Sequence, residues 1–281
     1  MENKCHLMIE FQVMISLGFS PCPNDTFIFY AMVNNRTDTH GLDFELHIED
    51  VETLNRLAMT KALDVTKISC HAFQYLQDDY KFLRSGGAFG RGCGPLIVAK
   101  KSYIWKDLKG KSIAIPGELT TAYLLLRLFF DAALDMKPSS IVPMLFHEIP
   151  AAVRDGRVDA GLIIHESRFT YPEYGLLKVI DMGEWWEKET GLPIPLGGII
   201  AKKALGPKIE IIESLIRKSV EYSIANRNEA MPYIREHSQE LSETVINNHI
   251  GLYVNDFTLD MGEEGIASLN ELLLRARYAD R

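Results

Sequence analysis

The stretch VDAGLIIHESRFTY, residues 158–171, carries the strongest indication of fold class in this chain. Its first part, residues 158–164, is a short apolar run in which Asp159 is the one charged residue. Such runs are typical of strands buried in a parallel sheet, and these strands point their carboxyl ends at the ligand crevice of α/β proteins. His165 follows directly, so we expect a titratable imidazole at that crevice, where it is a candidate general base. A plain hydrogen bond to the neighbouring loop is the alternative role.

Short apolar runs alternate with helical patterns on both sides of this segment, which predicts an α/β fold. We expect strands at residues 14–19, 44–48, 64–69, 96–99, 112–117, 158–164, 176–182 and 199–201. We expect helices at residues 26–33, 51–62, 118–134 and 149–157, and successive helices from 208 to the end. The Pro- and Gly-containing segment 190–198 is expected to be a rigid loop.

The glycine-rich segment 86–95 precedes an expected strand instead of following one. A dinucleotide-binding fingerprint follows a strand and opens a helix, so this segment is not one. We expect a loop that approaches the ligand, or a hinge.

The order of these elements predicts two lobes joined by two crossing strands, near residues 95–99 and 198–201. Lobe I is expected to be discontinuous, with residues 14–98 and 199–281, and lobe II to be inserted as residues 99–198. Residues 1–13 precede the first convincing strand and are expected to form an N-terminal extension. The ligand crevice is expected between the lobes.

Composition and charge narrow the range of functions. The chain has 281 residues, 47% of them hydrophobic and 24% charged, which are the proportions of a globular protein. The formal net charge is −8, and Lys and Arg occur in pairs but not in longer runs, which argues against nucleic acid or an anionic membrane as partner. No stretch approaches a membrane span and no signal peptide is evident, so we expect a cytoplasmic protein.

The four cysteines, Cys5, Cys22, Cys70 and Cys93, are widely spaced and form no CxxC or His/Cys pattern. Reduced thiols are the simplest interpretation, and the sequence predicts no metal site. Cys93 has no identified basic partner and is expected to be a packed small residue, not a nucleophile.

Hydroxyl groups at the start of the 118–134 helix are candidates for binding an anion. Thr120 and Thr121 lie where free backbone N–H groups and hydroxyls can hold a carboxylate or phosphate. Simple N-capping by either threonine is the alternative, and the two roles are compatible.

Further polar side chains occur at strand ends and turns that face the expected crevice. Asn24 and Asp25 follow the first strand, and Ser69 ends the 64–69 strand. Helix capping is the alternative role for Asn24 and Asp25. Arg168 is a candidate partner for a substrate carboxylate, with an ion pair to Glu166 or Glu184 as the alternative.

Several long motifs resemble one known family. They are GFSPCPNDTF (18–27), DVTKIS (64–69), GCGPL (92–96), PG with TTA (116–122), HESR (165–168) and WWEKETGLPIPLGG (185–198). Together, in this order, they make the chain similar to the 1,4-dihydroxy-6-naphthoate synthases from about residue 14 to residue 201.

This resemblance implies a two-lobed fold of the type II periplasmic-binding-protein kind. It also implies a lyase of menaquinone biosynthesis that converts cyclic dehypoxanthine futalosine, an aromatic carboxylate linked to a ribose remnant, without a cofactor. By the same resemblance His165 is the general base. The chemistry suits the residues: Thr120 and Thr121 would hold the carboxylate, and Asn24, Asp25 and Ser69 the sugar hydroxyls.

Three alternatives share parts of this pattern. A non-catalytic solute-binding protein, cytoplasmic or exported, would have the same lobes. The related chorismate dehydratase would share the fold and an aromatic carboxylate. A regulatory ligand-binding domain would need a DNA-binding segment, which is not evident. The partner expected in every case is a small molecule, and the sequence predicts no oligomeric state.

Overall fold

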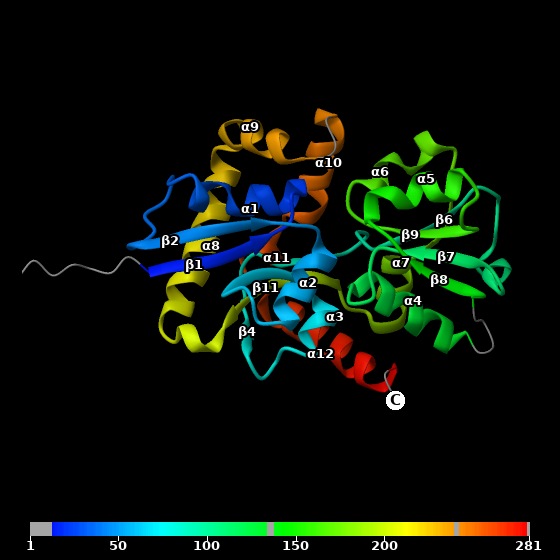
Figure 1. The fold of residues 1–281 in the computed structure, drawn as a ribbon, viewed down its shortest axis with the longest axis horizontal. Coiled ribbons are helices and arrows are strands. Elements are labelled where there is room, and N and C mark those ends of the chain that lie inside the picture. Colours follow the sequence, from blue (N-terminus) through cyan, green and yellow to red (C-terminus); the bar gives the residue numbers. More distant parts are fainter. Residues whose placement is uncertain (1–12, 134–137, 239–241, 280–281) are drawn as a thin grey trace, which may run out of the picture.

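Two mixed sheets, each flanked by helices, make up the protein (Figure 1). The computed structural model describes residues 13–133, 138–238 and 242–279. The predicted N-terminal extension, residues 1–13, therefore lies outside the described residues except for its last one. The α/β class predicted from the sequence is confirmed.

The first sheet has the strand order β2-β1-β3-β11-β4, and β5 also pairs with β11. Its strands are β1 (Val13–Phe19), β2 (Leu42–Ile48), β3 (Val65–Ser69), β4 (Tyr80–Phe82), β5 (Ala88–Gly90) and β11 (Ile194–Lys202). The helices packed around it are α1 (Pro23–Val33), α2 (Val51–Met59), α3 (Cys70–Phe73), α8 (Lys208–Ala225), α9 (Arg227–His237), α10 (Glu243–Tyr253), α11 (Asp256–Leu259) and α12 (Gly262–Ala279). Apolar side chains of β1 pack with α1 and α8 into one core.

The second sheet has the strand order β10-β6-β9-β7-β8. Its strands are β6 (Leu96–Ala99), β7 (Ser112–Ile115), β8 (Ser140–Pro143), β9 (Ala160–Ile163) and β10 (Leu177–Asp181), and its helices are α4 (Thr121–Ala132), α5 (Ile149–Arg154), α6 (Ser167–Thr170) and α7 (Met182–Thr190). The strand before His165, β9, is parallel to β7 but antiparallel to β6. The apolar run correctly indicated a buried strand, and the predicted parallel pairing is found with β7 but not with β6.

The lobe boundaries stay a prediction. The predicted cuts at residues 98 and 199 fall inside the two crossing strands, whereas β6 lies wholly in the second sheet and β11 wholly in the first. From β6 to the end of α7 the chain stays with the second sheet, and it returns to the first with β11.

Two local expectations are corrected by the structure. Helix α1 begins at Pro23, earlier than expected, because a proline is well tolerated in the first turn of a helix. The segment 194–198, expected to be a loop, is the first half of β11. Its proline, Pro195, is accommodated at a register shift between β11 and β5, where a ladder hydrogen bond is not required.

The lobes touch directly at the loop before α4. The backbone N–H of Leu119 donates to the carboxylate of Glu52 on α2 (3.1 Å to Oε2). Gly117 has φ +151°, and a Cβ there would lie 2.4 Å from Cδ of Glu52. A glycine is therefore required both by the backbone and by the close approach of the two lobes.

We expect Gly117→Ala to weaken this contact between the lobes. The matched control is Gly175→Ala, which also has a positive φ (+67°) but nothing within 4 Å of its Cβ position. Gly175→Ala should lower the free energy of unfolding by about 1 kcal/mol, because alanine is strained at positive φ. Gly117→Ala should lower it by more, because its Cβ would also overlap Glu52. Only Gly117→Ala should speed hydrogen exchange at the Leu119 amide. Equal exchange rates at Leu119 in both variants would show that the contact does not hold the lobes together.

Candidate active site

A cavity lies between the two lobes and encloses about 630 Å³ of empty space, including the part that opens to solvent. Both sheets contribute to its walls. Its lining residues include Ser20, Asn24, Asp25, Lys67, Ser69, Cys93, Thr120, Thr121, His165, Leu196 and Tyr253. Of the site residues predicted from the sequence, Arg168 is the one that does not line the cavity.

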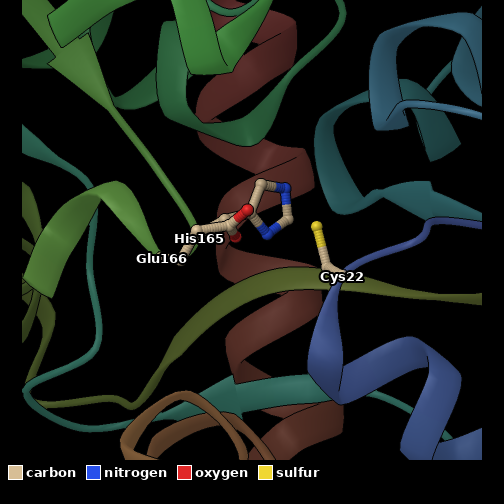
Figure 2. Close-up of side chains that lie close together, drawn as sticks. All are labelled: Cys22, His165 and Glu166. Carbon is tan, nitrogen blue, oxygen red and sulfur yellow. The ribbon is translucent and has the colours of Figure 1, made fainter. Parts of the chain in front are cut away.

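His165 enters the cavity from the turn that joins β9 to α6. Its backbone is left-handed, with φ 55°, which is uncommon for a residue other than glycine. Strained backbone of this kind persists where the surrounding structure enforces it, and it is often found at functional sites. The turn directs the ring toward the first lobe (Figure 2).

The His165 ring is enclosed by aromatic rings from both lobes. Phe146 meets it edge-on at 5.0 Å, and His249 of α10 lies nearly parallel to it at 6.1 Å between centroids. Burial lowers the pKa of His165 to about 4, while Asp25 raises it and Lys67 lowers it. The imidazole is therefore neutral near pH 7, the form that accepts a proton.

A buried ion pair forms the first lobe's side of the cavity. Lys67 Nζ lies 3.0 Å from Asp25 Oδ1 and donates to the carbonyl oxygen of Gly86 at 2.8 Å. Asp25 also accepts hydrogen bonds from the hydroxyl of Ser20 (2.8 Å) and from the amide of Asn24 (2.8 Å). Pairing and hydrogen bonding together offset the cost of burying both charges.

Lys67 was missed by the sequence reasoning. It lies in the middle of β3, whose five residues are all buried. A lysine inside such a short buried strand needs a partner, and this was the signal available in the sequence.

Asn24 connects this ion pair to a second histidine. Its side-chain oxygen lies 2.9 Å from Nε2 of His249, and its amide group donates to Asp25. Since the Asn24 oxygen can only accept, His249 carries its proton on Nε2. Burial lowers the pKa of His249 well below the usual value, with a further contribution from His165. His249 was also missed, because nothing in the pattern of its helix distinguishes it from a core residue.

The two threonines line the cavity, and one of them, Thr120, also caps α4. Thr120 is the N-cap of α4, where its hydroxyl accepts from the N–H of Tyr123 (3.2 Å) and donates to the carbonyl of Gly117 (2.7 Å). Thr121 Oγ1 donates to the carbonyl of Leu196 (2.7 Å) and accepts from the N–H of His71 (3.1 Å). The capping role is thus observed for Thr120, and Thr121 joins the two lobes at the cavity wall.

Ser69 and Arg168 have contrasting positions. Ser69 lines the cavity, and its hydroxyl accepts from the buried amide of Asn55 (3.2 Å). Arg168 points away and pairs with Asp181 at 2.6 Å, while it also donates to the carbonyls of Gly92 (2.9 Å) and Gly94. Because its guanidinium is committed to these acceptors, Arg168 is not carried into the substrate contacts proposed below.

Burial, not activation, governs the thiols. Cys93 lines the cavity, but burial raises its pKa to about 12 and so leaves it protonated.

Cys22, at the start of α1, lies close to His165 and Glu166 (Figure 2). Within the described part of the chain, these three residues are the one group of His, Cys, Asp or Glu side chains whose ligand atoms lie close enough together to hold a metal ion.

The sequence profile of a family described as menaquinone biosynthesis matches residues 15–278. The chain belongs to this family. It is 49% identical to the 1,4-dihydroxy-6-naphthoate synthase of Thermus thermophilus, with 93% of each chain covered, and 47% identical to the enzyme of the same name from Streptomyces coelicolor, with 93% of this chain and 92% of that one covered. The resemblance drawn from the sequence motifs is therefore confirmed.

Solved structures agree with the predicted fold. A protein of Archaeoglobus fulgidus has a TM-score of 0.88 and 39% identity, over 95% of this chain and 98% of that chain. The periplasmic aliphatic sulphonate binding protein of Escherichia coli has a TM-score of 0.67 at 13% identity, over 95% of this chain and 89% of that chain. The second likeness concerns the fold alone, and it confirms the periplasmic-binding-protein-like fold class.

We expect Lys67→Met to destabilise the protein by about 3–5 kcal/mol, because it leaves the Asp25 carboxylate buried without its counter-charge. The matched control is Lys202→Met, which breaks a partly exposed pair with Asp64 (25% and 29% side-chain exposure). That pair should contribute at most about 1 kcal/mol. Urea unfolding compares the two variants, and equal losses of stability would contradict the assigned importance of the buried pair.

Proposed function

We propose that this protein is a cofactor-independent carbon–carbon lyase that converts cyclic dehypoxanthine futalosine to 1,4-dihydroxy-6-naphthoate, with His165 as general base. The observation that carries the proposal is the neutral, desolvated imidazole at the end of β9, inside a cavity between the lobes. The names of the relatives at 49% and 47% identity support the same reaction.

In the proposed reaction His165 removes a proton from a sugar hydroxyl or from a carbon next to a carbonyl. The carbon–carbon bond at the spiro centre then breaks, the sugar fragment leaves, and the ring system becomes aromatic. Hydrogen-bond donors around the cavity stabilise the developing enolate, since preorganised donors act strongly where water is excluded. A positioned general base contributes about 10²–10⁴-fold to such a rate.

The aryl carboxylate is proposed to lie at the start of α4, beside Thr120 and Thr121. Both hydroxyls already donate to backbone carbonyls, so the proposed donors to the carboxylate are backbone N–H groups. The first turn of a helix leaves backbone N–H groups without intrahelical partners, and the helix dipole favours an anion there. Lys67 lines the same cavity, but its charge is already balanced by Asp25.

The sugar hydroxyls are proposed to bind on the first lobe's side, to Asn24, Asp25 and Ser69. All three are buried side chains that line the cavity. The Asp25 oxygens already accept from Lys67, Asn24 and Ser20, so a sugar hydroxyl would be an additional donor to one of them. The Ser69 hydroxyl, which accepts from Asn55, has its own hydrogen to donate. The relatives are named as biosynthetic enzymes, and we place the reaction in the cytoplasm. None of the described helices is long and apolar enough to cross a membrane.

Incubation of the purified protein with cyclic dehypoxanthine futalosine, followed by mass spectrometry, tests this function. The naphthoate should appear with the wild type, and His165→Ala should lower turnover by about 10²–10⁴-fold because the base is removed. His147→Ala is the control, since His147 is an exposed histidine in the same lobe, next to Phe146. Turnover by His165→Ala at the wild-type rate would contradict the assignment of the base, and absence of product from the wild type would contradict the reaction.

The pH dependence of kcat/KM tests the state of the base. With a pKa of about 4, His165 stays unprotonated from pH 8 down to about pH 5, so kcat/KM should not fall over that range. It should fall at lower pH, where the imidazole takes up a proton and no longer acts as a base. Circular dichroism at each pH shows whether the protein is still folded. Recovery of activity after return to pH 7 shows that the loss is reversible and is not due to unfolding. An acidic limb centred near 6.5, the ordinary histidine pKa, would contradict the account.

A further inference from the structure

Cys22, His165 and Glu166 come together from the two lobes, and of the three His165 lines the cavity. Cys22 precedes α1 in the first lobe, and His165 with Glu166 follows β9 in the second. The thiol, one imidazole nitrogen and one carboxylate oxygen all lie within 4.8 Å of one another. Figure 2 shows the Cys22 sulfur pointing at the His165 ring and the Glu166 carboxylate beside that ring.

These three groups are a donor set suited to zinc. Thiolate sulfur, imidazole nitrogen and carboxylate oxygen all bind Zn²⁺, with bonds of about 2.0–2.3 Å. Tetrahedral bonds of that length place the ligand atoms about 3–4 Å apart. The three ligand atoms lie within 4.8 Å of one another, so binding of an ion requires them to move closer by at most about 1–2 Å.

The charges at this cluster also favour a divalent cation. Burial and the neighbouring Glu166 raise the pKa of the Cys22 thiol, so the thiol is protonated without a metal and must release its proton when an ion binds. Once that proton is released, the thiolate and the Glu166 carboxylate together balance two positive charges, and a neutral His165 offers a lone pair. Cys22 and Glu166 are buried, with 3% and 8% of their surface exposed, so water competes weakly for the ion. Zinc sites with three protein ligands keep a fourth position for water or another small molecule.

We propose that Cys22, His165 and Glu166 form an inhibitory binding site for a zinc-like divalent cation. The bound ion takes the lone pair that His165 needs as a base. It also links the two lobes, because one ligand comes from the first lobe and two from the second. The ion is therefore an inhibitor at this site and not a cofactor.

The direct test measures binding of Zn²⁺ alone to the whole protein by calorimetry, so it does not depend on the proposed reaction. The wild type should bind one ion, and Cys22→Ser should weaken binding by at least the roughly 10–100-fold that loss of an outer-shell partner costs. Glu166→Gln should weaken it as well, which keeps the test decisive if Cys22→Ser fails to fold. Cys70→Ser is the control, because Cys70 is another buried thiol of the first lobe and lies outside the cluster.

Co²⁺, added in place of Zn²⁺, shows by its absorption spectrum whether a thiolate binds the metal. A thiolate-to-cobalt charge-transfer band should appear with the wild type and with Cys70→Ser, and it should be absent with Cys22→Ser. Absence of binding, or binding that both Cys22→Ser and Glu166→Gln leave unchanged, would overturn the proposed site.

Inhibition is measured separately, in the lyase assay. Zn²⁺ should inhibit the wild type, and Cys22→Ser, which retains the base, should stay active at Zn²⁺ concentrations that stop the wild type. Binding at Cys22 without inhibition would overturn the inhibitory role. A protein that binds Zn²⁺ but forms no naphthoate would contradict the proposed function and not the metal site.

Discussion

The buried ion pair between Asp25 and Lys67 is the interaction on which the rest of the site depends. It fixes the start of α1 against the middle of β3, and it orients Asn24 through a hydrogen bond to the same carboxylate. Asn24 in turn fixes the ring of His249, which lies against His165 from the opposite lobe. A chain of direct contacts therefore connects the interior of the first lobe to the proposed base.

This arrangement explains how a histidine beside a carboxylate remains neutral. Asp25 favours the charged imidazole and Lys67 opposes it, so the two effects offset each other. Burial among Phe146, His249 and the cavity walls is then the largest influence, and it lowers the pKa. The same desolvation that costs stability keeps the ring in the form that accepts a proton.

The sequence was a good guide to the elements and a partial guide to the site. The strands around the motifs were predictable because their apolar runs are short and bounded by turn residues, and His165 was predictable because it directly follows one of them. Lys67 lies on a buried strand and His249 on a C-terminal helix. No local sequence pattern indicates that either residue lies near His165. The direction of Arg168 was also beyond the sequence, since its partner Asp181 lies on β10, an element whose position only the fold determines.

The metal-ligand cluster is also formed by residues that are far apart in the sequence. The sequence predicted no metal site, because spacing rules detect ligands that are close along the chain. Cys22 is more than one hundred residues from His165, and only the approach of the lobes brings the sulfur to the ring. If the cluster binds an ion as proposed, the ion and the substrate proton compete for one nitrogen lone pair of His165.

Nuclear magnetic resonance titration of the His165 ring in protein labelled at histidine tests the central claim most directly, with His165→Ala used to assign its signal. The account predicts that this signal is unchanged between pH 8 and pH 5 and titrates with a pKa of about 4. A pKa near 6.5, as for a solvent-exposed histidine, would show that the ring is not desolvated by its surroundings and would contradict the account.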